Sequence, residues 1–241
     1  MKHKMNVKNG IIAVILTFGL LAFASHEKEH KLEGEGLAAS VPLDVKITGT
    51  ISHITYRSGQ NGTVTFNCFP ASVEEFKQVR DQIGKEPHGV VALQMMVYEM
   101  YRRDCTIGEA CIRLNNTLHN VNQPISRLRE LFGNDTNYAR PYQIAAFLKG
   151  ATPQNGYSPS KPYTVEVRVS AVHRYQNSND YQTQVLYLDV LTKGKSRDYE
   201  MVEVLKTLKP REGQYFIVFN CGGVYSQVQQ ASFANPFQGL D

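Results

Sequence analysis

The sequence predicts an α+β fold with an N-terminal hairpin, a helical middle segment and a C-terminal antiparallel sheet. Two observations support this fold class. Apolar residues recur at helical spacing between residues 72 and 149, and they alternate with polar residues, as in strands, from Tyr163 onwards. Before the helices, strand-forming residues flank the turn Ser58–Gly62, which predicts a hairpin with a five-residue loop.

Start and stop signals mark the helices of the middle segment. Ser72 and Glu75 form a capping box, and the helix that follows ends at Gly84. The next helix, Pro87 to Arg103, is apolar on nearly every face, so we expect it to be the central buried helix. The other predicted helices cover residues 106–114, opened by a second capping box of Thr106 and Glu109, residues 124–133 and residues 141–149.

The C-terminal part changes to the strand period after a connection rich in proline. Residues 151–162 hold three prolines and one glycine, which indicates a loop. Val165 and Val167 then alternate with Glu166 and Arg168, a pattern typical of a strand with one buried face. The predicted strands of this antiparallel sheet are 163–169, 184–191, 199–205, 215–220 and 224–228.

The first 24 residues have the three-part pattern of a secretory signal peptide. Lysines precede an uncharged run from Ile11 to Ala24, and Ala22-Phe23-Ala24 fits a signal-peptidase site. This run of 14 residues is short of the ~20 that a membrane-spanning helix needs. We therefore expect cleavage after Ala24, no permanent membrane anchor, and a secreted or periplasmic location.

The predicted domain organisation is a signal peptide over residues 1–24, a flexible tether over 25–40 and a single α+β domain over 41–241. The tether is charged and almost free of large apolar side chains, so it cannot form a core of its own. The formal net charge is +4, and removing the three lysines of the signal segment leaves +1. A nucleic-acid-binding domain would show a basic stripe, so we expect no nucleic-acid partner.

The four cysteines are Cys68, Cys105, Cys111 and Cys221. An even number in an exported chain permits two disulfides, and Cys105–Cys111 is the closest local pair. The alternative is that the cysteines are buried free thiols, which pack like small apolar side chains. A zinc site is not expected, because the cysteines show no C-x-x-C spacing and no paired histidines lie near them.

No motif predicts a catalytic residue, a metal site or a cofactor. Residues 26–30 match H-E-x-x-H, but they lie in the polar tether, where no apolar face would form a pocket, so we expect no zinc site there. The sequence also lacks a G-x-S-x-G motif and a Walker loop. Cys105 with His88 or His119 would give a nucleophile pair, which is the basis of the alternative function, a small cell-envelope hydrolase.

Aromatic and basic residues gather on both sides of the predicted helix 141–149. Arg140 and Tyr142 lie at its start, and Tyr157 and Tyr163 lie in and after the proline-rich connection. A rigid aromatic loop is suited to ligand contact, so these four residues form the candidate ligand-binding site. The alternative is that Tyr142 and Tyr163 pack the helix against the sheet.

Several segments resemble a family of exported bacterial proteins that is grouped as a domain of unknown function. They are the helix around Phe76, residues 142–156 (YQIAAFLKGATPQNG), the strand at Tyr163 and the strand at Gln214–Phe216. The resemblance covers roughly residues 70–230 and implies an extracytoplasmic α+β domain without catalytic residues. The predicted function is a non-catalytic binding or interaction module that needs no cofactor. Its expected partner is a protein or glycan ligand outside the cytoplasm.

Overall fold

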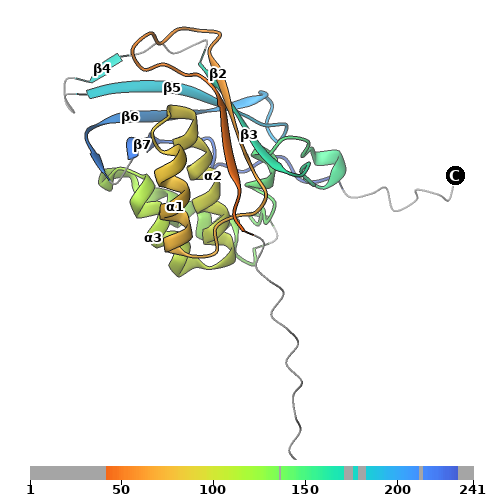
Figure 1. Ribbon diagram of the computed structural model, residues 1–241. Helices are drawn as coiled ribbons and strands as arrows, with labels where there is room; N and C mark the ends of the chain where they lie inside the picture. Colours follow the sequence, from red (N-terminus) through yellow and green to blue (C-terminus); the bar gives the residue numbers. More distant parts are fainter. Residues whose placement is uncertain (1–41, 136, 171–175, 179–182, 212–213, 233–241) are drawn as a thin grey trace, which may run out of the picture. The chain divides into compact units, whose positions relative to one another are not determined.

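The structure is a computed structural model that describes residues 42–135, 137–170, 176–178, 183–211 and 214–232 (Figure 1). The predicted signal peptide (1–24) and tether (25–40) lie outside these residues. Val41–Asp241 cluster into one compact unit. None of the helices described combines the length and the apolar character that crossing a membrane requires.

One antiparallel sheet contains both the N-terminal hairpin and the C-terminal strands, so the predicted α+β class is confirmed. The order across the sheet is β1-β2-β3-β5-β6-β7, and β4 pairs with β5. The hairpin joins the rest between β2 and β3, where Val64 lies opposite Val165. The strands are β1 (Val45–Gly49), β2 (Asn61–Phe66), β3 (Tyr163–Val169), β4 (Gln176–Ser178), β5 (Thr183–Leu191), β6 (Tyr199–Arg211) and β7 (Gln214–Asn220).

The helices of the middle segment lie on one side of this sheet (Figure 1). They are α1 (Val73–Ile83), α2 (Pro87–Arg103), α3 (Cys105–Asn115) and α4 (Asn122–Leu131), with short 3-10 turns η1 (Leu118–Asn120), η2 (Ala145–Phe147) and η3 (Pro153–Asn155). The predicted cap of α1 is present, because Ser72 Oγ accepts the N–H of Glu75 at 3.1 Å. The Glu75 carboxylate reaches back to the N–H of Ala71 at 2.7 Å, one residue before the N-cap.

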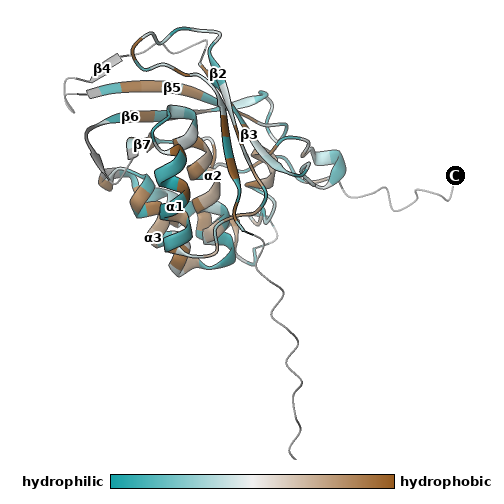
Figure 2. Cartoon of the chain, in the orientation of Figure 1, coloured by the Kyte–Doolittle hydropathy of each residue, from teal (hydrophilic) through white to brown (hydrophobic). Residues whose placement is uncertain are grey.

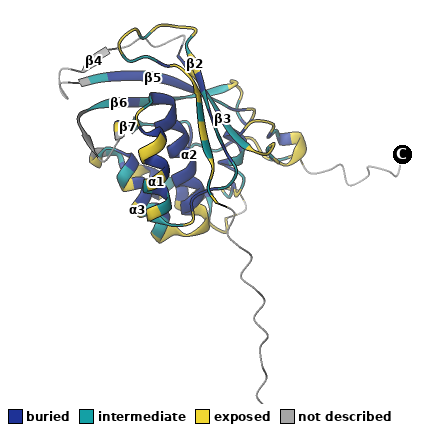
Figure 3. Cartoon of the chain, in the orientation of Figure 1, coloured by how far each residue is buried: buried dark blue, intermediate teal, exposed yellow. Residues whose placement is uncertain are grey.

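Helix α2 is the centre of the core, as predicted. All fifteen residues from Pro87 to Tyr101 are buried (Figure 3). The helix packs against strands β2, β3, β5, β6 and β7 and against α1, α3 and α4. Contact with five strands means that much of the inner face of the sheet covers this one helix. Helix α1 covers part of the remaining side, and it turns its hydrophilic residues outward (Figure 2).

The strands next to the hairpin have one apolar and one polar face. On β3, Val165, Val167 and Val169 are buried, whereas Glu166 and Arg168 lie on the opposite face. The same alternation continues into β2, where Val64 and Phe66 are buried. Because strand side chains alternate between faces, the apolar set faces α2 and the polar set forms an outer face that remains available to solvent.

The predicted helix 141–149 is wrong, since only the short turn η2 forms there. Its main-chain groups are bonded to other segments. Thr192 Oγ1 donates to the carbonyl of Ala146 at 2.6 Å, and the N–H of Lys149 donates to the carbonyl of Thr164 at 2.9 Å. A continuous helix would bond the N–H of Lys149 to the carbonyl of Ala145, so here a tertiary bond replaces a helical one.

The predicted strand 224–228 is also wrong, because a side chain occupies the place of a neighbouring strand. Gln143 Nε2 donates to the carbonyls of Val224 and Ser226, each at 2.7 Å, and Gln143 Oε1 accepts the N–H of Val228 at 3.1 Å. Val224 and Val228 are buried. Their alternation therefore reflects burial of a loop and not pairing in a sheet.

Several predicted boundaries differ from the structure. Helix α4 covers Asn122–Leu131 and not 124–133, and strand β6 extends to Arg211 and not to 205. Helix α3 begins at Cys105 because Asp104, and not Thr106, is its N-cap, and the Asp104 carboxylate accepts the N–H of Thr106 at 2.9 Å. The hairpin loop covers residues 50–60 and not five residues, because β1 ends at Gly49 and β2 begins at Asn61. A longer loop leaves enough chain for Tyr56 to hydrogen-bond to the main chain of Tyr187 on β5.

The packing of α2 predicts a strong difference between two leucine truncations. Leu93 is fully buried in α2, whereas Leu118 is 78% exposed. Leu93→Ala should lower the free energy of unfolding by about 2–5 kcal/mol, since it leaves a cavity. Leu118→Ala should change it by less than about 0.5 kcal/mol. Urea denaturation of both variants measures this, and equal midpoints would show that α2 is not the core helix.

Candidate functional site

Two of the predicted ligand residues are used to hold the C-terminal segment. The rings of Tyr142 and Tyr157 stack with their centroids 4.9 Å apart. The hydroxyl of Tyr157 donates to the carbonyl of Gln229 at 2.9 Å, and the N–H of Ala231 donates to the hydroxyl of Tyr142 at 3.1 Å. Both hydroxyls are therefore bonded to the segment that follows β7.

Arg140 also bonds to the segment that follows β7, as the aromatic pair does, whereas Tyr163 packs elsewhere. Arg140 is buried, and its Nε donates to the carbonyl of Val228 at 3.1 Å. Tyr163 lies at the start of β3, where its ring contacts those of Phe66 and Phe69. Tyr163 is thus part of the packing between the hairpin and β3, and the four candidate residues do not form one surface.

The residues of the alternative hydrolase site are separated by the length of α2. His88 lies in the first turn of α2, and Cys105 follows its end. Seventeen helical residues span about 25 Å at the usual rise. The side chain of His119 lies outside the described part of the structure. The structure therefore does not join His88 and Cys105 into a nucleophile pair.

All four cysteines are free thiols in the structure, so the predicted Cys105–Cys111 bridge is not formed. Both residues belong to α3, with Cys105 exposed and Cys111 buried. Six residues along a helix separate the two Cα atoms by about 9 Å, which is beyond the reach of a disulfide. Burial raises the pKa of the Cys111 thiol to about 12 and that of Cys221 to about 12. Both thiols are accordingly inert core groups.

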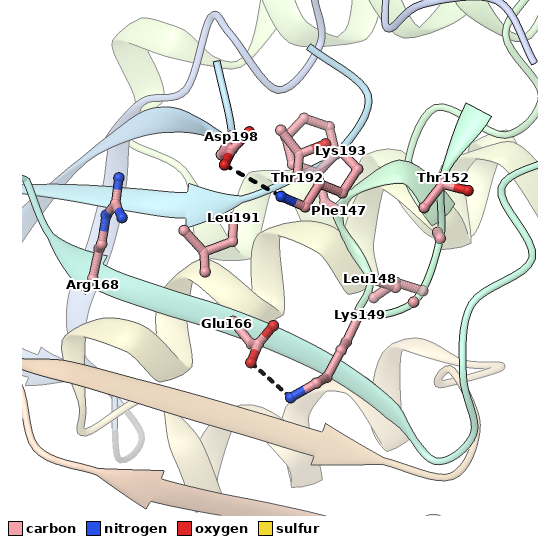
Figure 4. A pocket seen from close by; sticks show the side chains of 12 residues that line it. Phe147, Leu148, Lys149, Thr152, Glu166, Arg168, Leu191, Thr192, Lys193 and Asp198 are labelled. Atoms are coloured by element: carbon pink, nitrogen blue, oxygen red, sulfur yellow. Dashed lines mark hydrogen bonds and ion pairs between the residues drawn. The ribbon is translucent and has the colours of Figure 1, made fainter. Parts of the chain in front are cut away.

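A groove runs over the outer face of the sheet, in a place that the sequence analysis did not select. Two adjacent cavities form it, of about 330 Å³ and 470 Å³. They share Glu166, Arg168 and Leu191, so we treat them as one feature, the outer-face groove. The first cavity, shown in Figure 4, is lined by Phe147, Leu148, Lys149, Gly150, Ala151, Thr152, Glu166, Arg168, Leu191, Thr192, Lys193 and Asp198. The second is lined by Ser58, Gly59, Asn61, Gly62, Thr63, Glu166, Val167, Arg168, Val169 and Leu191.

Local geometry fixes the wall that carries Lys149. Gly150 has a φ of +85°, and a Cβ there would lie 2.2 Å from the Oγ of Ser160. Glycine is required at this position, because both the backbone conformation and the close approach exclude a side chain. The carbonyl of Lys149 accepts the N–H of Ser160 at 2.9 Å. The turn is thereby tied to the proline-rich connection before β3.

Charged side chains of opposite sign line the groove in pairs. Lys149 Nζ lies 2.9 Å from Glu166 Oε1, and Lys193 Nζ lies 3.2 Å from Asp198 Oδ2. In Figure 4 these two pairs lie on either side of Leu191. Three of the four side chains are more than half exposed, and such surface pairs contribute little to stability. They are therefore free to exchange their partners for a ligand.

A partly buried lysine outside the groove, Lys195, fixes the C-terminal segment. Lys195 Nζ donates to the carbonyls of Ser226 and Gln227 at 2.7 and 2.9 Å, and it contacts Ser226 Oγ at 2.6 Å. Burial lowers the pKa of Lys195, while nearby Glu200 raises it. The ammonium group donates to two main-chain carbonyls and contacts one hydroxyl, which makes Lys195 an anchor of Ser226 and Gln227.

The sequence contained one signal for the groove. Glu166 and Arg168 alternate with buried valines, so the pattern placed them on the polar face of β3. Lys149, Lys193 and Asp198 come from loops that tertiary contacts bring together, and no spacing in the sequence indicates this. Within the described part of the chain, no group of three or more His, Cys, Asp or Glu side chains could hold a metal ion. The H-E-x-x-H residues 26–30 lie outside that part.

Residues 68–232 match the domain of unknown function DUF6935. The chain belongs to this family. No curated protein and no solved structure matches the chain. The DUF6935 match includes every residue that lines the first cavity of the groove, and it begins after β2. The hairpin residues 58–63, which line the second cavity, precede it.

His88 joins the DUF6935 region to the preceding hairpin. It is fully buried, and a Cβ on Gly62 of β2 would lie 2.4 Å from its Cδ2 atom. Neither ring nitrogen has a well-formed hydrogen bond within the described residues. Burial lowers the pKa of His88 to about 4, and the nearby carbonyl of Thr48 opposes this only in part. The imidazole is therefore packed in its neutral form.

The burial of His88 predicts a loss of stability in acid. A lowered folded-state pKa means that the unfolded chain binds the proton more readily. Stability is thus complete above the ordinary value of 6.5 and is lost as the pH falls towards about 4. Between pH 7 and pH 4 the free energy of unfolding should fall by about 3 kcal/mol more than in His88→Gln. Urea denaturation across this range measures the difference, and parallel profiles for the two proteins would contradict it.

Proposed function

We propose that the chain is an exported, non-catalytic binding module and that its outer-face groove binds a glycan. The observation that carries this proposal is the lining of the groove. Two exposed ion pairs, Lys149–Glu166 and Lys193–Asp198, flank an apolar floor that includes Leu148 and Leu191. A sugar ring has the matching chemistry, since its hydroxyl groups both donate and accept hydrogen bonds while its C–H face is apolar.

The position of the groove favours a glycan over a peptide. Peptides that bind sheets usually add a strand at an edge, where main-chain groups are unpaired. The groove lies instead on the face of β3 and β5, whose main-chain groups pair with each other from Val167 to Val169. A ligand on that face must be recognised by side chains, and the side chains available are ammonium, carboxylate and hydroxyl groups.

Binding is favoured over hydrolysis by the state of the candidate catalytic groups. A glycosidase needs a carboxyl group whose surroundings keep it protonated, usually by burial. The side chains of Glu166 and Asp198 are 31% and 72% exposed. Ser226 and Lys195 are in contact, but the ammonium is engaged by two carbonyls and neither residue lines the groove. These features support a binding role.

The glycan proposal predicts that the Lys149–Glu166 ion pair contributes to the affinity for an oligosaccharide. In a titration of the ¹⁵N-labelled mature chain with a panel of neutral and acidic oligosaccharides, at least one ligand should shift resonances of residues 147–152, 166–168 and 191–198. The double variant Lys149→Met, Glu166→Gln should bind that ligand about tenfold more weakly, which corresponds to the loss of one or two hydrogen bonds.

The matched control removes an exposed ion pair elsewhere. Glu109→Gln, Arg113→Met abolishes the pair on α3, whose atoms are 2.6 Å apart, and it should bind the oligosaccharide as the wild type does. If no member of the panel shifts groove resonances, or if the two double variants bind equally, the groove is not a glycan site.

Export predicts a defined mature N-terminus. When the whole chain is expressed in a bacterium with an intact secretion system, the periplasmic or secreted protein should begin at Ser25, because Ala22 and Ala24 fit the signal-peptidase site. Intact-mass analysis measures this. Ala24→Leu should block cleavage and retain the leader. Recovery of full-length wild-type chain from the cytoplasm would contradict export.

A further inference from the structure

Arg168 is held in the groove in a way that differs from the neighbouring lysines. Its Nε atom lies 3.3 Å from Asp189 Oδ2. The side chain of Asp189 is only 2% exposed, and its other oxygen, Oδ1, has no hydrogen-bond partner in the described residues. A buried carboxylate needs a cation beside it, so Asp189 fixes one side of the guanidinium group.

An aromatic ring fixes the plane of the same group. The guanidinium carbon of Arg168 lies 4.9 Å from the ring centroid of Tyr199 on β6. The strand register places these groups on one face, since Arg168 lies opposite Asp189 and Leu191 lies opposite Tyr199. Three adjacent strands thus orient one side chain, and little conformational entropy is left to lose when a ligand binds.

The remaining donors of Arg168 are open to the groove. The side chain is 44% exposed, and it lines both cavities. Among the described residues the hydrogen bond of this guanidinium is donated by Nε, and none is donated by Nη1 or Nη2, so the fork of N–H groups is available. A pre-oriented guanidinium fork matches a planar carboxylate, which it binds through two parallel hydrogen bonds.

We propose that the outer-face groove binds an acidic oligosaccharide and that Arg168 recognises the carboxylate of a uronic acid residue. This inference rests on the proposed glycan-binding function and names the ligand class. Because the two cavities lie on either side of Arg168 and Leu191, the recognised sugar has room for neighbours in both directions, as an internal unit of a chain has.

The charges around Arg168 favour one carboxylate over a phosphate monoester. The groove carries three cations, Lys149, Arg168 and Lys193, and two of them are paired with Glu166 and Asp198. Asp189 offsets much of the charge of Arg168 itself. A phosphate monoester, which carries nearly two negative charges, would meet the carboxylates of Glu166 and Asp198 without a surplus of positive charge, whereas a planar carboxylate carries one charge and matches the fork.

The test compares one oligosaccharide with and without its charge. Isothermal titration calorimetry of the mature chain should show that tetragalacturonate binds at least about tenfold more tightly than its methyl ester. Arg168→Gln should bind the two forms equally. Arg168→Lys should lose most of the preference, because an ammonium group cannot form the paired bonds. Arg113→Gln, a variant of an arginine on α3, should retain the preference.

The outcomes separate this inference from the proposed function. If the wild type binds the ester and the acid equally, or if Arg168→Gln retains the preference, Arg168 is not a carboxylate anchor, although the glycan-binding function stands. If sulfated oligosaccharides bind more tightly than uronates, the ligand class is wrong. If no saccharide of any charge binds, the proposed function itself fails. Thermal unfolding of each variant, with a midpoint near that of the wild type, shows that any loss of binding is not a loss of folding.

Discussion

Burial of α2 from Pro87 to Tyr101 is the constraint on which the rest of the structure depends. A helix with apolar side chains on every face must be covered on every face, and each fully buried Leu, Met or Val side chain contributes about 1.5–3 kcal/mol. A flat sheet covers one side of a helix. The sheet therefore curls, with strands β2, β3, β5, β6 and β7 in contact with α2, and α1, α3 and α4 complete the enclosure. Some polar groups inside are paired, as where Asn115 Nδ2 donates to Gln94 Oε1 at 2.7 Å, whereas the ring nitrogens of His88 have no well-formed hydrogen bond within the described residues.

The same constraint explains why the groove lies where it does. Helix α2 covers the inner face of the sheet, so only the outer face can expose polar side chains to a ligand. The loop that carries Lys193 is hydrogen-bonded to the C-terminal segment. The carbonyl of Gly194 accepts the N–H of Gln229 at 2.8 Å. Tyr157 bonds to the carbonyl of the same Gln229. The aromatic pair thus supports one wall of the groove, although it does not contact a ligand there.

Local signals in the sequence were sufficient for elements that their own residues specify. The bounds of α2 followed from Pro87 and an unbroken apolar pattern, and β3 followed from its alternating valines. Prediction failed where a distant residue decides the local structure. Gln143 hydrogen-bonds to main-chain groups of residues 224–228, and Thr192 hydrogen-bonds to the carbonyl of Ala146. Hydropathy cannot report such bonds, because they join positions more than 40 residues apart.

The candidate site was predictable only in part for the same physical reason. Glu166 and Arg168 could be assigned to a polar strand face, but their roles depend on which residues lie opposite. The buried partner Asp189 reads as an ordinary strand residue until β5 is placed beside β3 with Arg168 opposite it. A one-residue change of that register would turn Asp189 into the core and leave Arg168 without its partner. The groove is therefore specified by strand register, and the register is in turn specified by the valines and leucines that must face α2.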